Sequence, residues 1–495
     1  MKRIQDSVHG CINVDKLFFE HIIDTPNYQR LRHIEQTSIR SIFPSARHDR
    51  FIHSLGVFHI GKMIVAQLDK EWSAWGIAKS RKEQIVQSYL MACLLHDVGH
   101  APFSHTFEEY YGPQADLAEQ LCALLHEEFK ADLDDVRSPA HHEYTSAIIT
   151  HKVYRNAVDI LGGNIELIIR MIIGCHYKDP AKQIENCFIS LLHGDVIDAD
   201  RLDYACRDVW ASGYCTSTID LNRLISAIHI KKNNSNQFVV CFNSNAINEI
   251  ESVINVKDFQ VKYVLNHHTV KYDQWLLVKA VETVALELFL DKIDTGNNKD
   301  DTTATAMRKL CNIKYLETDS NEDIQYNIKY LTDADFMFLM KQNADNPYCN
   351  EWFSRQYTMF PLWKSREEFY FHFSDINVSK DLSNVRFEDV IKKTVASIQG
   401  YNDSDVLILK AKYKARVKMD SIYIDIHGNV TKYTDLQSQI PKEVERVDNT
   451  FYYVYIDKKG LTKQEIENRR LEILSDLRRP LTNIYKGIDD GIYMK

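Results

Sequence analysis

The segment LLHDVGHAPFSH, residues 94–105, concentrates side chains that can do chemistry. His96 and Asp97 are adjacent, and His100 and His105 follow shortly after them. A neighbouring imidazole and carboxylate can bind one divalent cation from two directions, and further imidazoles close by can move protons beside that cation. The cluster therefore predicts a metal-dependent hydrolase.

Two ligands do not complete such a site. A cation with mixed nitrogen and oxygen donors takes about four protein ligands and keeps open positions for water and substrate. The segment RHDRFIHSLG, residues 47–56, offers His53 just before a helix that we expect over residues 56–68. Taken alone, His53 fits equally well as a capping or core histidine.

The segment GDVIDADRLDYACRD, residues 194–208, is dense in carboxylates on what should be one helix. Asp200 shares a face with Asp203 and with Tyr204, because these residues lie three and four positions further on. Asp200 is the candidate ligand, and Asp198 and Asp203 are neighbours that could be confused with it.

The composition of the chain is that of an ordinary soluble globular protein. Its 495 residues are 44% hydrophobic and 26% charged, enough for two or three domains with a buried core. The formal net charge of −9 does not favour bulk adhesion to nucleic acid, so we expect no nucleic-acid partner. The net charge does not exclude a local basic pocket that binds phosphate.

The ten cysteines form no C-x-x-C pair, which disfavours a thiolate zinc site and fits reduced thiols. The opening MKRIQDSVHG has no apolar core of a signal peptide, and no run of about 18 apolar residues could span a membrane. We expect a cytoplasmic protein with no membrane association.

Hydrophobic periodicity predicts a mainly α fold with a smaller C-terminal α+β appendage. The chain should divide into a core over residues 1–290, a helical extension over 291–369 and a small α+β domain over 370–495. Within these parts we expect helices over most of 15–230 and over 247–290, a strand or hairpin at 233–243, a polar loop at 294–305, strands at 406–410, 421–426 and 450–456, and a last helix at 463–477.

Six motifs occur in an order and spacing that resemble the HD-domain phosphohydrolase superfamily over about the first 270 residues. They are most similar to its deoxynucleoside triphosphate (dNTP) triphosphohydrolase branch, which includes bacterial enzymes and the mammalian SAM-and-HD-domain antiviral enzyme. The motifs are DSVHGCI, IIDTPNYQRLRHIEQ, ARHDRFIHSLGV, LLHDVGHAPFSH, HHEYTSA and DVIDADRLDYACRD.

The resemblance implies that His53, His96, Asp97 and Asp200 bind one divalent metal per active site. This agrees with the count of two imidazoles and two carboxylates. The ligand types suit Mn, Fe, Mg or Zn, and the sequence does not choose among these metals.

The resemblance also assigns residues for proton transfer. His105 is the expected catalytic histidine, with Glu108 as its supporting carboxylate three residues later, where it could orient the ring. His142 matches a further active-site histidine, unless it is a surface residue beside its neighbour His141. His100 matches a residue at the α-phosphate.

Phosphate and sugar contacts are expected from another five residues. The guanidinium group of arginine can donate two hydrogen bonds to one phosphate, and the resemblance points to Arg50 and Arg201 for this role. Arg201 stands where relatives carry a lysine. Each arginine could instead form an ordinary ion pair. Tyr204 and Asp208 are expected at the phosphate and the sugar 3′-hydroxyl, and Gln36 at the same hydroxyl. A site packed against C2′ would exclude ribonucleotides.

The stretch VKYVLNHHTVKY, residues 261–272, departs from the family. Leu265 and Asn266 replace the tyrosine and glutamine that line the base pocket in relatives, and Lys257 is a weak substitute for an arginine at the γ-phosphate. Base preference is therefore left open by the sequence.

Members of this branch are commonly oligomers with nucleotide effectors bound between subunits. We therefore expect a homo-oligomer, a dimer or a tetramer. Asp24 and Arg32 match positions that read a guanine effector, although a capping aspartate and a surface arginine would look the same.

The sequence thus predicts hydrolysis of a dNTP, with dGTP as one candidate, to deoxynucleoside and triphosphate. Alternatives are an HD-type phosphohydrolase acting on nucleoside monophosphates or cyclic nucleotides, and a nucleotide-sensing regulatory protein. Nucleotide depletion as a defence against phage follows only by analogy with the antiviral relative.

Overall fold

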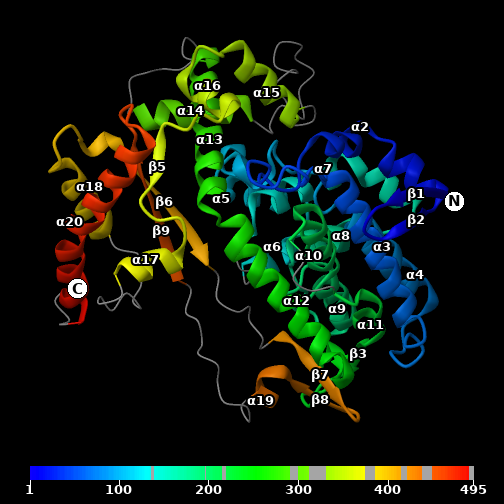
Figure 1. The fold of residues 1–495 in the computed structure, drawn as a ribbon. Helices are drawn as coiled ribbons and strands as arrows, with labels where there is room; N and C mark the ends of the chain where they lie inside the picture. The colour runs from blue at the N-terminus through cyan, green and yellow to red at the C-terminus, as the bar shows by residue number, and fades with distance from the viewer. Residues whose placement is uncertain are drawn as a thin grey trace. The chain divides into compact units, whose positions relative to one another are not determined.

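The computed structural model describes residues 1–134, 139–195, 197–214, 219–289, 299–311, 331–373, 385–413, 421–437 and 449–489 (Figure 1). Over these residues the fold is mainly helical with small sheets, which confirms the predicted fold class. The chain divides into two compact units. The first takes in the described parts of Met1–Asp258, Val281–Asn343 and Arg416–Glu443, and the second those of Phe259–Ala280, Ala344–Ala415 and Val444–Lys495.

The first unit is built around helix α3 (Arg50–Leu68), which packs against α4 (Lys79–Leu95) and α10 (Ala199–Ser212). Asp49 caps α3 by accepting the backbone N–H of Ile52 at 2.9 Å. Among the described residues, α3 is the one helix long and apolar enough to cross a membrane, and 61% of that window is buried inside the protein. That burial fits a core helix.

The first unit contains further helices, most of which are labelled in Figure 1. The α-helices are α1 (Lys16–Phe18), α2 (Pro26–Gln29), α5 (Gln114–Cys122), α6 (Glu127–Leu133), α7 (His141–Ile160), α8 (Ile165–Ile173), α9 (Gln183–Leu192), α11 (Leu221–Ser226), α12 (Ile247–Phe259), α14 (Lys299–Leu310), α15 (Asp333–Gln342) and α19 (Tyr433–Gln437). Short 3-10 helices cover η2 (Arg30–His33), η3 (Ser104–Thr106) and η4 (Glu108–Tyr111).

Two small sheets complete the first unit. Strands β1 (Lys2–Asp6) and β2 (Gly10–Val14) form an antiparallel hairpin at the N-terminus. The second sheet has the order β3-β4-β7-β8, in which β3 (Ile228–Lys232) and β4 (Phe238–Asn243) form the hairpin expected near residues 233–243. Strand β7 (Tyr423–Ile426) pairs in parallel with β4 and antiparallel with β8 (Asn429–Lys432).

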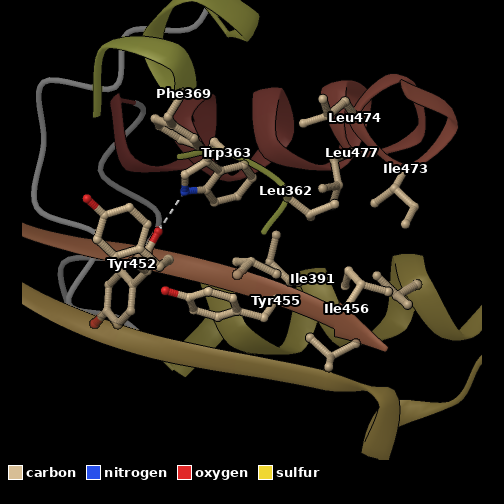
Figure 2. Close-up of a cluster of buried hydrophobic side chains, with 14 of the residues drawn as sticks. Leu362, Trp363, Phe369, Ile391, Tyr452, Tyr455, Ile456, Ile473, Leu474 and Leu477 are labelled. Atoms are coloured by element: carbon tan, nitrogen blue, oxygen red, sulfur yellow. Dashed lines mark hydrogen bonds between the residues drawn. The ribbon is translucent and has the colours of Figure 1, made fainter. Parts of the chain in front are cut away.

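The second unit has a three-stranded antiparallel sheet of order β5-β9-β6, in which the long strand β9 (Asn449–Asp457) is central. Trp363 is fully buried, and its ring N–H donates to the backbone carbonyl of Tyr452 at 2.9 Å (Figure 2). The other elements of this unit are α13 (His268–Phe289, which continues into the first unit), α16 (Pro347–Ser354), β5 (Met359–Pro361), α17 (Arg366–His372), α18 (Val385–Ala396), β6 (Val406–Tyr413) and α20 (Lys463–Asp489).

Helix α20 contributes a stripe of apolar side chains to the core of the second unit. Ile473 and Leu477 point toward Leu362 and the strands in Figure 2, and Leu474 belongs to the same buried cluster. Leu481 continues the stripe and is also fully buried. The helix therefore extends beyond residue 477, where we expected it to end.

The structure departs from the sequence expectations at several places. The N-terminal hairpin was not anticipated. Because Asp49 provides the cap, α3 begins at Arg50 and contains His53, which we had placed before the helix. We expected a polar loop over residues 294–305. Residues 294–298 lie outside the described residues, and over 299–305 the prediction is wrong, because α14 begins at Lys299. The two compact units are discontinuous along the chain, and the expected domain boundaries at 290 and 370 stay a prediction.

Candidate active site

Four predicted metal ligands meet where three helices converge. His53 lies in the first turn of α3, His96 and Asp97 follow the end of α4, and Asp200 lies in the first turn of α10. The Nε2 atom of His53 is 3.0 Å from Oδ1 of Asp200, 3.3 Å from Nε2 of His96 and 3.5 Å from Oδ2 of Asp97. Segments far apart in sequence thus present their polar atoms to one point.

The hydrogen bonds on the outer side of both rings test whether this point suits a cation. Nδ1 of His53 lies 2.7 Å from the carboxylate of Asp203, and Nδ1 of His96 lies 3.0 Å from the carbonyl of Cys93. Both partners only accept, so in a neutral ring the proton is on Nδ1 and Nε2 carries a lone pair. Two lone pairs at 3.3 Å, faced by two carboxylates, call for a positive charge between them.

The charges at this point agree with that requirement. Burial lowers the pKa of His53, but the carboxylates of Asp200 and Asp203 outweigh burial and raise it to about 10, so a proton on Nε2 can supply this positive charge until a metal displaces it. Burial likewise works against ionisation of Asp200, yet the two histidines hold its pKa well below the usual range. The donor set of imidazole nitrogen and carboxylate oxygen fits a divalent metal, as does the compact group of His53, His96 and Asp97, whose ligand atoms lie within 4.8 Å of one another.

The contacts of helix α10 distinguish Asp198, Asp200 and Asp203, which the sequence left as alternative metal ligands. Asp198 is the N-cap and accepts the backbone N–H of Arg201 at 2.7 Å. Asp203 faces Nδ1 of His53, on the side of the ring away from the other ligands. Asp200 faces Nε2, on the side where the other predicted ligands lie.

A second cluster gathers around the carboxylate of Glu108. Its Oε1 lies 2.8 Å from Nδ1 of His105, 3.0 Å from Nδ1 of His100 and 3.1 Å from Nδ1 of His142. The rings of His100 and His142 stack with centroids 4.1 Å apart. Nε2 of His100 lies 3.2 Å from Oδ1 of Asp97, so the two clusters are adjacent.

The imidazoles of this second cluster differ in charge and exposure. Burial lowers the pKa of His100 to about 3, which keeps that ring neutral. Burial also works against a charge on His142, but the carboxylate of Glu108 prevails and raises the pKa to about 9. The side chain of His105 is 65% exposed, in contrast to the buried His100. The cluster therefore combines a neutral ring, a cationic ring and an accessible ring around one carboxylate.

Helix α7 comes close enough to bring His142 to the motif because Gly99 has no side chain. A Cβ at Gly99 would lie 2.3 Å from the backbone nitrogen of Ser146. The hydroxyl of Ser146 accepts the Gly99 N–H at 2.9 Å, and the hydroxyl of Thr145 donates to the Gly99 carbonyl at 2.8 Å. The HDVGH segment is thereby hydrogen-bonded to α7.

The next part of the motif adopts a strained backbone that is held from outside. Phe103 and Ser104 have φ of 54° and 56°, in the left-handed region that non-glycine residues rarely occupy. The carboxylate of Asp333 accepts the N–H of Phe103 at 2.6 Å and that of Glu35 at 2.8 Å. We had not identified Asp333 from the sequence, and no local pattern links it to a motif 230 residues away.

Residues 50–205 match the family model described as HD domain. This range of the chain therefore carries an HD domain, the domain for which the HD phosphohydrolase superfamily is named. The matched range contains all four predicted metal ligands and the cluster around Glu108. HD domains bind divalent metals, in agreement with the donor set described above.

The relatives of this HD protein include enzymes of known activity and uncharacterized proteins. It is 30% identical to the deoxynucleoside triphosphate triphosphohydrolase SAMHD1 of Danio rerio over 226 residues, 43% of this chain and 34% of that protein. It is 29% identical over 301 residues to an uncharacterized protein of Methanocaldococcus jannaschii, 61% of this chain and 53% of that protein. The chain thus spans between a third and about half of the length of these relatives.

Two solved structures share the fold. A phosphohydrolase from Bacteroides thetaiotaomicron is 19% identical with a TM-score of 0.61, covering 92% of this chain and 100% of that one. A hypothetical protein from Aquifex aeolicus is 20% identical with a TM-score of 0.56, covering 96% and 99%. The likeness extends over nearly the whole chain, including the C-terminal part outside the HD domain.

Within the HD domain, the two predicted phosphate arginines are engaged in contacts of their own. Arg50 is buried and donates to Asp97 at 2.6 Å and to the hydroxyl of Ser104 at 3.0 Å. Arg201 donates to the carboxylate of Asp198 and to the carbonyl of Gly194. In this structure Arg50 orients the carboxylate of Asp97, and Arg201 reinforces the start of α10.

The predicted sugar-binding residues are connected through His48, which we had not singled out. The ring of His48 contacts the carboxylate of Asp208 at 2.8 Å, and its carbonyl accepts the backbone N–H of Gln36 at 3.1 Å. The side-chain oxygen of Gln36 and Nδ1 of His48 are buried without a hydrogen-bond partner. Tyr204 lies half-buried on α10, and burial raises its pKa.

The remaining predicted residues lie elsewhere. Asp24 pairs with Lys2 at 3.0 Å, and the guanidinium of Arg32 lies 3.4 Å from the ring centre of Phe51. Leu265 and Asn266 belong to the second unit, so their predicted role beside the base stays a prediction. Lys257 lies in the last turn of α12 in the first unit, and its predicted role at the γ-phosphate also stays a prediction.

Proposed function

We propose that this HD protein is a dNTP triphosphohydrolase that converts a dNTP to a deoxynucleoside and inorganic triphosphate. The observation that carries the proposal is the adjacency of two clusters. His53, His96, Asp97 and Asp200 form a cation site, and Glu108 with its three imidazoles lies beside it, linked through the 3.2 Å contact between His100 and Asp97.

A divalent cation held by the four ligands would lower the pKa of a bound water and offset charge on a phosphoryl oxygen. The ligands themselves are set up for this by their surroundings. The Arg50 guanidinium donates to the carboxylate of Asp97 and holds it in place. Mn, Fe, Mg and Zn all suit the donor set.

The residues around Glu108 would stabilise negative charge on the phosphate and transfer a proton to the leaving group. His142 carries a positive charge near neutral pH and would stabilise the negative charge that develops on the α-phosphate. Water adds to the α-phosphorus as the bond to the sugar O5′ breaks. His105 would deliver a proton to O5′, since its Nδ1 lies 2.8 Å from Oε1 of Glu108 and its side chain is exposed.

The support for a dNTP as substrate is the 30% sequence identity to the deoxynucleoside triphosphate triphosphohydrolase SAMHD1 of Danio rerio over 226 residues. The buried, unpartnered atoms of Gln36 and His48 next to Asp208 favour a hydroxyl-bearing ligand in that region, as the prediction of 3′-hydroxyl binding requires. Arg50 and Arg201 remain proposed phosphate contacts, which would have to be made alongside their present partners.

Other parts of the proposal follow from the same relatives. We include regulation by a nucleotide effector, with Asp24 and Arg32 as its tentative site, and assembly into a homo-oligomer. Residence in the cytoplasm and a role in depleting nucleotides during phage infection also belong to the proposal.

The experiment is a product-resolved turnover assay. Purified protein is loaded with Mn, Fe, Mg or Zn and incubated with each dNTP, alone and with each other nucleotide as effector. Release of deoxynucleoside and triphosphate in equal amounts is the expected result. Monophosphate or diphosphate as the product would refute the proposal, as would turnover of cyclic nucleotides or nucleoside monophosphates alone.

The regulatory alternative needs a separate readout. An Asp97→Ala variant should lose all hydrolysis if the protein is an enzyme. A cellular phenotype that persists in this variant would instead favour a nucleotide sensor.

A further inference from the structure

Asp203 is a fully buried carboxylate that the proposed reaction does not use. It accepts from Nδ1 of His53 at 2.7 Å, from Nε2 of His9 at 2.6 Å, and from Nε and Nη2 of Arg207 at 2.8 and 2.9 Å. Burying a carboxylate is costly unless its oxygens are paired. Here two rings and a guanidinium satisfy it, so its position is tightly defined.

The same network reaches the N-terminal hairpin. Arg207 lies 2.9 Å from Oδ2 of Asp6, and Oδ1 of Asp6 accepts the backbone N–H groups of Val8 and His9 at 2.5 and 2.9 Å. The turn between β1 and β2 therefore places His9 against Asp203. The hairpin therefore contacts a carboxylate that α10 carries.

Helix α3 is shaped to admit this carboxylate. A Cβ at Gly56 would lie 1.9 Å from Oδ1 of Asp203 and 2.5 Å from Nη2 of Arg207. Glycine inside a helix costs about 1 kcal/mol relative to alanine. Gly56 follows His53 by three positions, so the gap opens beside the ring that Asp203 contacts.

We infer that Asp203 is a positioning residue for the metal site, acting through His53. By accepting from Nδ1 it fixes the tautomer and the ring orientation, so that Nε2 presents its lone pair toward His96, Asp97 and Asp200. The inference rests on the proposed role of His53 as a metal ligand. It extends that proposal to Asp203 and to Gly56, which makes room for the Asp203 carboxylate.

The test measures metal binding by the full chain, without substrate. Asp203→Asn keeps the shape of the side chain but removes the charge that holds the protonated Nδ1. Loss of such a partner typically weakens metal binding about 10–100-fold. We expect that change in the dissociation constant for Co²⁺, together with an altered visible absorption spectrum of the bound Co²⁺, which reports ligand geometry.

Two further variants separate positioning from general stability. Gly56→Ala displaces the carboxylate without removing it and should weaken Co²⁺ binding in the same way. His9→Gln takes away another partner of Asp203 but leaves the contact with His53, so its Co²⁺ affinity should stay within about threefold of wild type. Circular dichroism and melting of the metal-free proteins record folding.

The outcomes are distinguishable. The inference is overturned if Asp203→Asn folds and binds Co²⁺ with the affinity and spectrum of the wild type. If Asp203→Asn does not fold, the same result in folded Gly56→Ala overturns it. A loss of affinity that parallels the loss of stability equally in all three variants, His9→Gln included, would overturn it too. Failure of the wild-type protein to bind Co²⁺, or full binding by His53→Ala, would count against the proposed function itself.

Discussion

Nη1 of Arg50 lies 2.6 Å from Oδ2 of Asp97, and both side chains are buried. This pair joins the first residue of α3 to the aspartate of the HD motif. It explains how a carboxylate can stay ionised in the protein interior beside two histidines. Burial works against that charge, and Arg50 is the strongest of the groups that hold the pKa of Asp97 well below its usual range.

Replacing Arg50 by methionine should therefore destabilise the metal-free protein. Removal of one partner of a buried ion pair costs about 3–5 kcal/mol, because the other charge is left without compensation. Urea unfolding measures the change. Lys2→Met is the control, since its ion pair with Asp24 is half exposed on both sides and should contribute no more than about 1 kcal/mol. Equal effects of the two substitutions would contradict the assignment.

Removal of the metal should lower both activity and stability. A ligand present at about 100 times its dissociation constant stabilises the folded state by about 2.7 kcal/mol. Treatment with a chelator should abolish hydrolysis and lower the melting temperature, and added metal should restore both. In Asp200→Ala the metal-dependent rise in melting temperature should shrink or disappear. An undiminished rise in that variant would show that the metal binds elsewhere.

The pH dependence of hydrolysis should report the Glu108–His142 pair. Glu108 raises the pKa of His142 from 6.5 to about 9 against the effect of burial, so the cationic ring is present below about pH 9 and lost above it. Glu108→Gln removes this support, and the alkaline fall in activity should move to lower pH by more than about one unit. Glu109→Gln, at an exposed neighbouring position, should leave the profile unchanged.

The same pair contributes to stability with a defined sign. Because the pKa of His142 is higher in the folded protein than its ordinary value of 6.5, protonation favours the folded state. That contribution is complete below about pH 6.5 and is lost as the pH rises through about 9. The wild-type advantage over Glu108→Gln in urea unfolding should fall over this interval; an advantage that does not change with pH would contradict the assignment.

Gly99→Ala should separate the HD motif from α7. The new Cβ would meet backbone atoms of Ser146 and Thr145 at 2.3 and 2.5 Å, and backbone cannot move aside cheaply. We expect destabilisation of about 1–3 kcal/mol or more, with loss of activity as His142 moves away from Glu108. Gly61→Ala is the matched control, since the nearest atom there is the Cys93 sulfur at 2.8 Å, on a side chain that can turn. A larger effect at Gly61 would refute this reasoning.

The amino-acid sequence by itself determined which chemistry is available. His96 and Asp97 are neighbours in the chain, so their cooperation needs no knowledge of the fold. Apolar periodicity, a local property, was enough for the mainly helical class and for the strand near residue 240. The contact between His105 and Glu108 also follows from a spacing of three residues, although here it spans two short 3-10 turns.

The tertiary structure alone decided how these residues are divided among roles. Asp198, Asp200 and Asp203 look alike in the sequence, and only their contacts in the fold distinguish them. Asp198 caps the N-terminus of α10, Asp200 faces Nε2 of His53, and Asp203 faces Nδ1 of the same ring. Asp333 and His9 act on the site from positions that no local pattern connects to it. Such assignments depend on packing between segments that are distant in the sequence. The residues adjacent in the chain do not predict this packing, because it is a property of the whole fold.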